Sequence, residues 1–283
     1  MDLCNISVIK SLMSEAGIVF RKEFGQNFLI NRIIPENIAD NASVTEDSLI
    51  IEIGPGIGCL TKELALRYKK VVAIEIDNGL IPVLEKTLCD FDNVTVINAD
   101  VMKTDIKEIV EQYSDGMPVC VCANLPYYIT TPILMYLLES DVKFSSITVM
   151  VQNEVASRLV AKAGSADYGA ITAVLGFYGN AEKLFKVSAG SFMPAPKVDS
   201  AVVKIDLYKE NVYFPKDEKF FRNLIKAAFE MRRKTLVNAI NAKFPHLEKS
   251  RIAECLASLG FPETVRGERL STQKFVDLSN LLV

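Results

Sequence analysis

The stretch that decides the fold is LIIEIGPGIG, at residues 49–58. Its first five residues form a short apolar run of the kind found in buried strands, and the glycines that follow allow a tight turn. The segment from Leu60 to Tyr68 then has the length of a short helix. Because a strand, a glycine turn and a helix make up half of a βαβ unit, the stretch predicts an α/β protein with a parallel sheet.

The same alternation continues along the chain. After residue 164 the rhythm changes, and a last helix is expected at 171–178, followed by β segments at 182–187 and 200–207, of which at least one is antiparallel. Strands and helices alternating at this spacing predict a doubly wound sheet. The earlier strands are expected at 49–53, 71–76, 94–98, 119–123 and 147–151, and the earlier helices at 3–17, 33–42, 60–68, 80–88, 106–113, 132–139 and 154–161.

The C-terminal part of the chain has only helical patterns. They run near 217–230, 232–243, 248–259 and 271–281, with breaks at Pro245, Pro262 and Gly267. The sequence therefore predicts two domains, an α/β domain at 1–208 and a small all-helical domain at 209–283.

Composition excludes several classes of function. No apolar run approaches the roughly 18 residues that a membrane span needs, and the N-terminus has no signal-like pattern, so we expect a cytoplasmic protein. The six cysteines form no C-x-x-C pair and are expected to be buried thiols in a reducing compartment. A single histidine, His246, argues against a His-based metal site or a Ser-His-Asp triad, and we expect no metal.

Charge is distributed unevenly along the chain. Residues 1–190 carry 16 Lys/Arg and 24 Asp/Glu, whereas residues 191–283 carry 16 Lys/Arg and 11 Asp/Glu. A net charge of +5 on the C-terminal part, attached to an acidic body, predicts an anionic partner for that part.

Polar residues stand where successive strands end. Gly54 and Gly56 let a ligand come close to the backbone at the start of a helix. Glu75, at the end of the second sheet strand, can accept hydrogen bonds from ribose hydroxyls, and Asp100, after the third, can accept from the amine of an adenine. Together these positions predict a nucleoside-containing cofactor.

The glycine spacing distinguishes between cofactors of this kind. It is G-x-G-x-G, whereas dinucleotide-binding turns use G-x-G-x-x-G. Glu52 also precedes the turn, and an acidic strand residue suits a cofactor with a cationic amino acid part better than it suits a pyrophosphate. Both features favour S-adenosyl-L-methionine.

The tetrapeptide Asn124-Leu125-Pro126-Tyr127 follows the fourth strand. An Asn offers a carbonyl acceptor, a Pro stiffens the turn and a Tyr offers a flat face on which a base can stack. The same residue types also occur in ordinary turns. The tetrapeptide gains meaning from the cofactor residues beside it, which favour a site that grips the exocyclic amine of an adenine.

Four motifs in this order resemble the ribosomal RNA adenine dimethyltransferases. They are QNFL at 26–29, EIGPGIG at 52–58, NLPYYIT at 124–130 and FMPAPKVDS at 192–200. The resemblance extends from about residue 20 to residue 271. The last motif and RRKTL at 232–236 are most similar to the branch that acts on the small ribosomal subunit.

This resemblance implies a Rossmann-like class I methyltransferase sheet of seven strands, the last antiparallel, with a helical rRNA-recognition domain at the C-terminus. It implies dimethylation of N6 on two adjacent adenines in the 3′-terminal hairpin loop of small-subunit rRNA. The expected partner is the rRNA of an immature small subunit, bound by a monomer during ribosome biogenesis. The alternatives are a large-subunit adenine dimethyltransferase of the antibiotic-resistance type and a non-catalytic assembly factor.

The resemblance and the chemistry of the side chains together assign roles to residues. Around the cofactor, Gln26, Asn27 and Leu29 are expected to close over it, with Gly54 beneath its methionine end. Around the target base, the Asn124 side chain and the backbone carbonyl of Leu125 or Pro126 are expected to accept from the adenine amine. The other expected contacts are Tyr127 and Phe192 against the faces of the base, and Arg21, Lys22, Arg232, Arg233 and Lys234 against the RNA.

Overall fold

The computed structural model describes residues 1–18 and 27–283. Three of the expected site residues, Arg21, Lys22 and Gln26, lie outside these ranges. The chain divides into two compact units, one formed by residues 1–156 and 182–207 and the other by residues 157–181 and 208–283. Within the described ranges no helix is long and apolar enough to cross a membrane.

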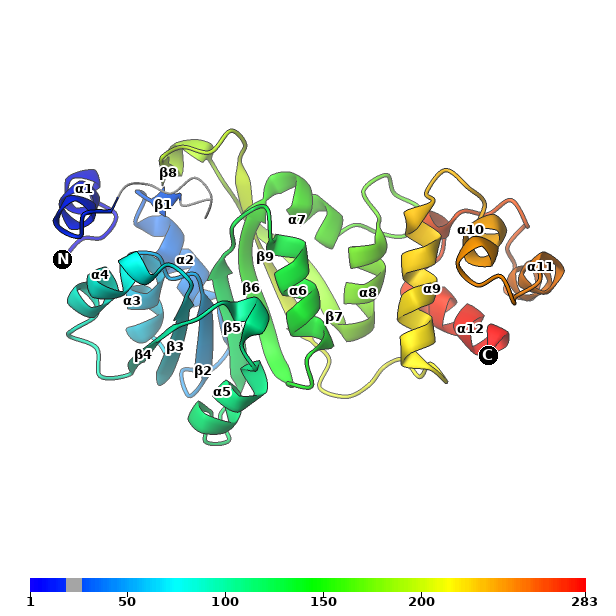
Figure 1. Cartoon of the computed structure of the whole chain (residues 1–283), viewed down its shortest axis with the longest axis horizontal. Coiled ribbons are helices and arrows are strands. Elements are labelled where there is room, and N and C mark those ends of the chain that lie inside the picture. The colour runs from blue at the N-terminus through cyan, green and yellow to red at the C-terminus, as the bar shows by residue number, and fades with distance from the viewer. Residues whose placement is uncertain (19–26) are drawn as a thin grey trace. The chain divides into compact units, whose positions relative to one another are not determined.

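The first unit is built on a seven-stranded sheet with the order β4-β3-β2-β5-β6-β9-β7 (Figure 1). Strands β4, β3, β2, β5 and β6 pair in parallel, whereas β9 is antiparallel to β6. This confirms the predicted α/β sheet and its antiparallel last strand. The strands are β2 (Leu49–Ile53), β3 (Lys70–Glu75), β4 (Val94–Asn98), β5 (Val119–Asn124), β6 (Phe144–Gln152), β7 (Gly179–Val187) and β9 (Ser200–Leu207).

Helices follow the strands in the order that the sequence predicts, with ends that shift by a few residues. A short 3₁₀ turn at Asn78–Leu80 precedes α4, and others lie at Val101–Lys103 and Ala189–Ser191. The helices up to residue 159 are α1 (Ile6–Glu15), α2 (Ile33–Asp40), α3 (Cys59–Ala65), α4 (Ile81–Thr87), α5 (Ile106–Tyr113), α6 (Thr130–Glu139) and α7 (Asn153–Leu159).

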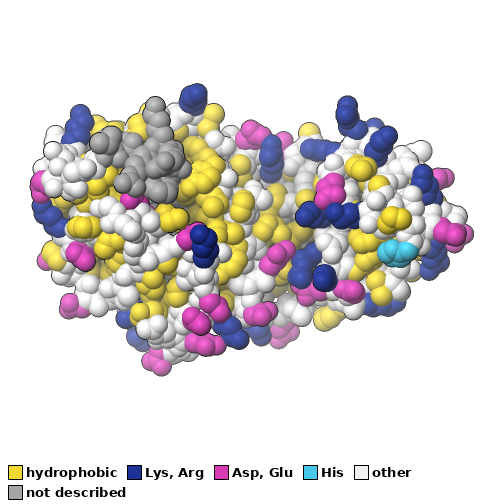
Figure 2. All heavy atoms as spheres, viewed as in Figure 1, with side chains coloured by type: hydrophobic (Ala, Val, Ile, Leu, Met, Phe, Trp, Pro, Cys, Tyr) yellow, Lys and Arg dark blue, Asp and Glu magenta, His cyan; other side chains and the backbone are white. Residues whose placement is uncertain are grey.

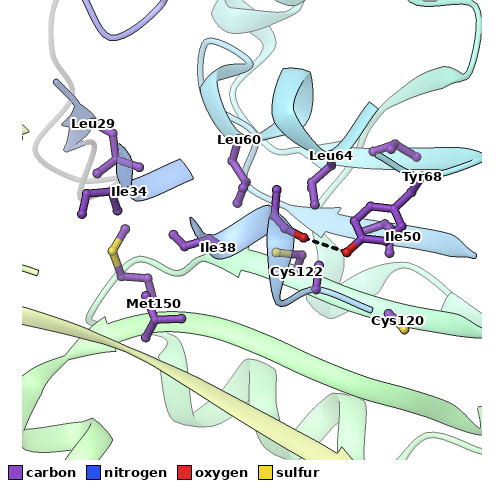
Figure 3. Close-up of a cluster of buried hydrophobic side chains, with 14 of the residues drawn as sticks. Leu29, Ile34, Ile38, Ile50, Leu60, Leu64, Tyr68, Cys120, Cys122 and Met150 are labelled. Atoms are coloured by element: carbon purple, nitrogen blue, oxygen red, sulfur yellow. Dashed lines mark hydrogen bonds between the residues drawn. The ribbon is translucent and has the colours of Figure 1, made fainter. Parts of the chain in front are cut away.

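A buried cluster packs α2 and α3 against the centre of the sheet (Figure 3). Ile50 on β2 and both Cys120 and Cys122 on β5 are fully buried in it, because alternate residues of a strand point to the same face. The Tyr68 hydroxyl donates to the Ala39 carbonyl at 2.7 Å, which satisfies a polar group inside the cluster. The expectation that all cysteines are buried is wrong for Cys89, which is exposed, and Cys59 is only partly buried.

A second, two-stranded sheet pairs β1 (Phe28–Leu29) with β8 (Phe192–Met193). Neither segment is predicted as a strand from the sequence, because each is two residues long and they are far apart in the chain. The pairing places Leu29 opposite Phe192, and both side chains join the buried cluster. It brings two of the four family-like motifs together.

The second unit is helical. Its helices are α8 (Ala170–Tyr178), α9 (Glu218–Glu230), α10 (Leu236–Lys243), α11 (Lys249–Ser258) and α12 (Thr272–Leu282), with a 3₁₀ turn at Gly267–Arg269. Phe221 and Phe275 are fully buried in it, and Phe177 of α8 packs on Phe221 with ring centroids 4.9 Å apart. Helix α8 therefore belongs with the C-terminal helices, although β7 and β9 follow it in the sequence.

The prediction that a helix begins at residue 232 is wrong. Arg232, Arg233 and Lys234 lie in the turn after α9, and α10 begins only at Leu236. Thr235 is the N-cap, and its hydroxyl accepts from the Asn238 N–H. A Thr is a favourable N-cap, whereas cations in the first turn would oppose the helix dipole, so the three charges stay outside the helix.

Candidate functional site

The glycine turn between β2 and α3 needs glycine because its backbone is left-handed. Gly54, Gly56 and Gly58 have φ angles of +71°, +61° and +90°. A Cβ atom at Gly54 would meet nothing within 4 Å, whereas one at Gly58 would lie 3.1 Å from the Thr87 hydroxyl on α4. Gly58 thus permits close helix packing, and Gly54 leaves open space for a ligand.

Glu75, at the end of β3, holds this turn in place. One carboxylate oxygen accepts from the Gly56 N–H at 3.1 Å and the other accepts from the Asp77 N–H at 2.8 Å. Burial raises the pKa of Glu75, and the two backbone hydrogen bonds act against that rise. Because each carboxylate oxygen has two lone pairs, the group can still accept from a ligand.

Glu52 is a buried carboxyl group on β2 with an unused acceptor. Its side chain is 1% exposed, and its Oε2 atom has no hydrogen-bond partner among the described residues. Burial raises the pKa of Glu52 to about 8, and the nearby charge of Glu75 acts in the same direction. A ligand with a positively charged end would satisfy this acceptor and lower its pKa.

Replacing Glu52 with Gln should stabilise the ligand-free protein above neutral pH. The folded protein keeps on Glu52 a proton that the unfolded chain loses near pH 4.5. Because of this group, the free energy of unfolding falls as the pH rises from about 4.5 to about 8, and it stays lowered above that pH. We expect the variant to gain on the order of 3 kcal/mol over wild type at pH 8 and little at pH 4. Urea unfolding at both pH values measures this, with exposed Glu46→Gln as control. Parallel pH profiles for wild type and Glu52→Gln would contradict it.

The segment after β5 presents acceptors at the same edge of the sheet. Asn124 is half-buried, and its side-chain amide makes no hydrogen bond within residues 1–18 and 27–283. The Pro126 carbonyl already accepts from the Ile129 N–H and the Thr130 hydroxyl, at 3.2 and 3.1 Å. Both of its lone pairs are therefore used, which leaves the Leu125 carbonyl as the better candidate for a second acceptor.

Tyr127 is fixed by its hydroxyl group. The Tyr127 and Ser200 hydroxyls lie 2.7 Å apart, and Ser200 is fully buried on β9. Burial raises the pKa of Tyr127. The phenol ring is thus held by β9 while it lines the pocket, which gives a rigid flat surface.

A pocket unites these features. Most of the expected cofactor and base residues line it, namely Asn27, Leu29, Gly54, Gly56, Glu75, Asn124, Leu125, Pro126 and Tyr127. Two expected residues are not among its described lining. Phe192 is 3% exposed in the core, and Asp100 caps the following 3₁₀ turn by accepting from the Met102 N–H at 3.0 Å. Asp100 nevertheless follows β4 at the carboxyl edge of the sheet.

Two apolar residues at the mouth of the pocket were not predicted from the sequence. Ile76 and Tyr128 line it and are 47% and 62% exposed. Their positions directly after Glu75 and Tyr127 were the available signal, because a large apolar side chain at a strand end remains exposed where a ligand covers it. Both offer flat or apolar surface to a purine ring.

In the second unit, the three expected RNA-binding cations differ. The Arg232 guanidinium pairs with Glu268 at 3.2 Å and donates to the carbonyls of Ala166 and Tyr168. Arg233 and Lys234 are exposed, with no side-chain partner in the described part of the chain. Figure 2 shows Lys and Arg side chains on the visible face of the helical second unit. Arg232 is therefore partly engaged in holding the fold, whereas its two neighbours face solvent.

Comparisons with known proteins agree with this geometry. The family model described as "Ribosomal RNA adenine dimethylase" matches residues 17–280. Proteins named "Ribosomal RNA small subunit methyltransferase A" from Lachnoclostridium phytofermentans and Bacillus licheniformis are 45% and 46% identical to this chain. These alignments cover 93% and 96% of it and 92% and 94% of the relatives.

Solved structures give the same result. A dimethyladenosine transferase from Plasmodium falciparum superposes with a TM-score of 0.74 at 27% identity, over 88% of this chain and 95% of that one. The 23S rRNA methyltransferase ErmE superposes with a TM-score of 0.69 at 25% identity, over 90% and 99% of the two chains. The chain is a methyltransferase and belongs to the ribosomal RNA adenine dimethylase family.

Proposed function

We propose that this protein transfers methyl groups from S-adenosylmethionine to N6 of two adjacent adenines in small-subunit rRNA. The observation that carries the proposal is the single pocket that joins the glycine turn and Glu75 to the Asn124 segment. Relatives at 45–46% identity are named as small-subunit enzymes, whereas the large-subunit methyltransferase is 25% identical. This difference favours the small subunit as the substrate.

The residues present fit the cofactor. Glu75 would accept from the ribose hydroxyls, Ile76 would cover a face of the adenine, and Asp100, which follows β4 at the carboxyl edge of the sheet, would accept from the adenine amine. Glu52 and the open space at Gly54 would receive the cationic methionine end, since Glu52 Oε2 has no partner within the described residues. Asn27 and Leu29, together with Gln26, would close the site. When bound, S-adenosylmethionine supplies an electrophilic methyl group on its sulfonium.

The Asn124 segment would prepare the acceptor nitrogen. The N6 lone pair of adenine is delocalised into the ring and is a poor nucleophile. We propose that Asn124 Oδ1 and the Leu125 carbonyl accept from the two amine hydrogens and hold the lone pair toward the methyl group. The barrier is then lowered mainly by positioning, which a neutral amide can supply without a strong base.

The target base must leave its stack to reach this pocket. We propose that the fixed ring of Tyr127 stacks on one face of it. Phe192 was expected at the other face, but its side chain is buried across the two-stranded sheet from Leu29. Phe192 would therefore support Leu29 of β1 from the core, and Tyr128 is the exposed aromatic residue at the mouth of the pocket.

We propose that the rRNA is engaged by Arg233 and Lys234, with Arg232 shared between RNA and the fold, and by Arg21 and Lys22 beside the target. The substrate would be the immature small subunit, met in the cytoplasm by a monomer. Exposed cations without intramolecular partners in the described residues support phosphate contacts.

Reversing two of these charges should weaken RNA binding without loss of folding. We expect Arg233→Glu/Lys234→Glu to bind small-subunit rRNA at least about tenfold more weakly, with a shallower dependence on salt, because each lost phosphate contact removes counterion release. Filter binding at several salt concentrations measures both. Lys209→Glu/Lys219→Glu is the control, since it makes the same charge change at exposed positions of the same unit. Equal slopes for the two variants would contradict the assignment.

Methyl transfer to purified ribosomal subunits tests the proposed function. The pure protein, supplied with tritiated S-adenosylmethionine, is expected to label immature small subunits and to leave large subunits unlabelled. Labelling of large subunits would favour the antibiotic-resistance type of activity. Stable binding to small subunits with no labelling would favour a non-catalytic assembly factor.

A further inference from the structure

Two cysteine side chains meet at the wall of the candidate cofactor pocket. The Sγ atoms of Cys4 and Cys59 lie 3.1 Å apart, and both thiols are free. A disulfide bond is roughly 2.05 Å long, so a movement of about 1 Å would join them. The two residues are 55 positions apart in sequence, and only the fold brings them together.

Two cavities adjoin the cysteine pair. Cys59 is the first residue of α3, directly after the glycine turn, and it lines the cofactor pocket. A second cavity, of about 270 Å³, is lined by both cysteines. That volume admits a molecule of the size of water or hydrogen peroxide. A small oxidant can therefore reach the pair without passing through the cofactor pocket.

Cys4 is suited to react first. Its contact with Cys59 lowers the pKa of the Cys4 thiol, and the charge of Arg32 acts in the same direction, whereas burial, Asp2 and Glu63 oppose it. A thiol with a lowered pKa has a larger thiolate fraction, and the thiolate is the nucleophilic form. Cys59 then has the position to resolve the oxidised sulfur.

The N-terminal segment that carries Cys4 packs directly on the glycine turn. Leu3 and the buried face of α1 share a hydrophobic cluster with Ile57 of the turn and with Phe28, which lines the cofactor pocket. The Lys62 ammonium also donates to the Met1 carbonyl at 2.9 Å. A covalent bond between Cys4 and Cys59 would thus act on a surface already in contact with the pocket wall.

We propose that Cys4 and Cys59 form a reversible redox modification site that weakens cofactor binding when it is oxidised by a hydroperoxide. The Cys4 thiolate attacks one peroxide oxygen, the O–O bond breaks, and hydroxide leaves as Cys4 sulfenic acid forms. The Cys59 thiol then attacks the Cys4 sulfur, the S–S bond forms and water leaves. Two thiols and one hydrogen peroxide give one disulfide and two waters, and a dithiol reductant restores the thiols.

The expected loss of cofactor affinity follows from the position of Cys59. Disulfide formation shortens the distance between the two sulfur atoms by about 1 Å. It therefore draws the start of α3 toward Cys4 and displaces the glycine turn that Glu75 holds through Gly56. The identity of the ligand rests on the proposed function, whereas disulfide formation does not.

The test uses the full chain with Cys89→Ser, which removes the exposed thiol. After treatment with hydrogen peroxide, we expect a peptide that links residues 4 and 59 by mass spectrometry and a thermal midpoint raised by several degrees. We also expect an affinity for S-adenosylmethionine about tenfold lower by calorimetry, with recovery in dithiothreitol. The matched variant Cys4→Ser/Cys89→Ser should bind the cofactor as the reduced protein does and should not respond to peroxide.

Absence of the linked peptide would overturn the site, and a linked peptide with unchanged affinity would overturn its effect on the pocket. Failure of the reduced protein to bind S-adenosylmethionine would instead count against the proposed function. The linked peptide and the thermal midpoint would still test the cysteine pair in that case.

Discussion

Asn124→Ala is expected to reduce methyl transfer at least 10³-fold while the affinity for S-adenosylmethionine stays within about twofold of wild type. The Asn124 amide has no partner in the described part of the chain and stands at the end of β5, beside the Leu125 carbonyl. Removing one preorganised hydrogen-bonding group from a reaction centre costs about 10²- to 10³-fold in rate. Here the loss should be at the upper end, because the same group both positions the amine and localises its lone pair.

The measurement pairs tritium transfer to small subunits with calorimetry of the cofactor. Asn211→Ala, an exposed asparagine outside the pocket, is the control and should behave as wild type. Transfer by Asn124→Ala within tenfold of wild type would remove the acceptor role. A large loss of cofactor affinity would place Asn124 in cofactor binding instead.

Glu75→Gln is expected to weaken the binding of S-adenosylmethionine by about 10²-fold or more. The carboxylate holds the Gly56 N–H and is 5% exposed, so the substitution puts an amide N–H against the turn or against the ribose. Hydrogen bonds to charged groups contribute about 1.5–3 kcal/mol each. The substitution affects two of them, the one from the Gly56 N–H and the one proposed from the ribose. Calorimetry at neutral pH gives the affinity directly.

Asp100→Asn is expected to weaken cofactor binding less than Glu75→Gln does. The Asp100 side chain is 28% exposed and lies within 3.6 Å of Lys103, so solvent and a neighbouring cation already compete for its oxygens. Its loss should therefore weaken binding by only about tenfold. Exposed Glu46→Gln should have no effect. An affinity for Glu75→Gln within threefold of wild type would exclude Glu75 as the ribose acceptor.

The sequence predicts the part of this fold that depends on local patterns. The succession of an apolar run and a helix, which residues 49–65 show with a glycine turn between them, recurs along the sheet, and the carboxyl ends of parallel strands share one edge. Glu75 and Asn124 could therefore be placed at a common site without coordinates. The residues that line the pocket between them agree with that placement.

Features that depend on distant contacts could not be predicted. The pairing of Phe28–Leu29 with Phe192–Met193 needs a partner far along the chain, and it is this pairing that buries Phe192. Helix α8 is apolar along almost its whole length, and this pattern does not reveal which unit the helix packs in. The contact between Cys4 and Cys59 likewise has no signature in sequence spacing.

The three cations at residues 232–234 could not be placed from the sequence for a different reason. A run of cations beside a helical pattern looks like part of the helix, but the cap at Thr235 and the partners of Arg232 decide otherwise. Only the contacts distinguish Arg232, which joins Glu268, from Arg233 and Lys234. The RNA-binding experiment therefore changes Arg233 and Lys234 and leaves Arg232 in place.

Mass-spectrometric mapping of the product tests most directly whether this pocket methylates adenine N6 in small-subunit rRNA. Immature small subunits are incubated with the pure protein and S-adenosylmethionine, and the rRNA is digested and sequenced. We predict N6,N6-dimethyladenosine at two adjacent positions in the 3′-terminal hairpin loop, and none with Asn124→Ala. Unmodified adenines in that loop after incubation with wild-type protein, or dimethyladenosine only in large-subunit rRNA, would contradict the account.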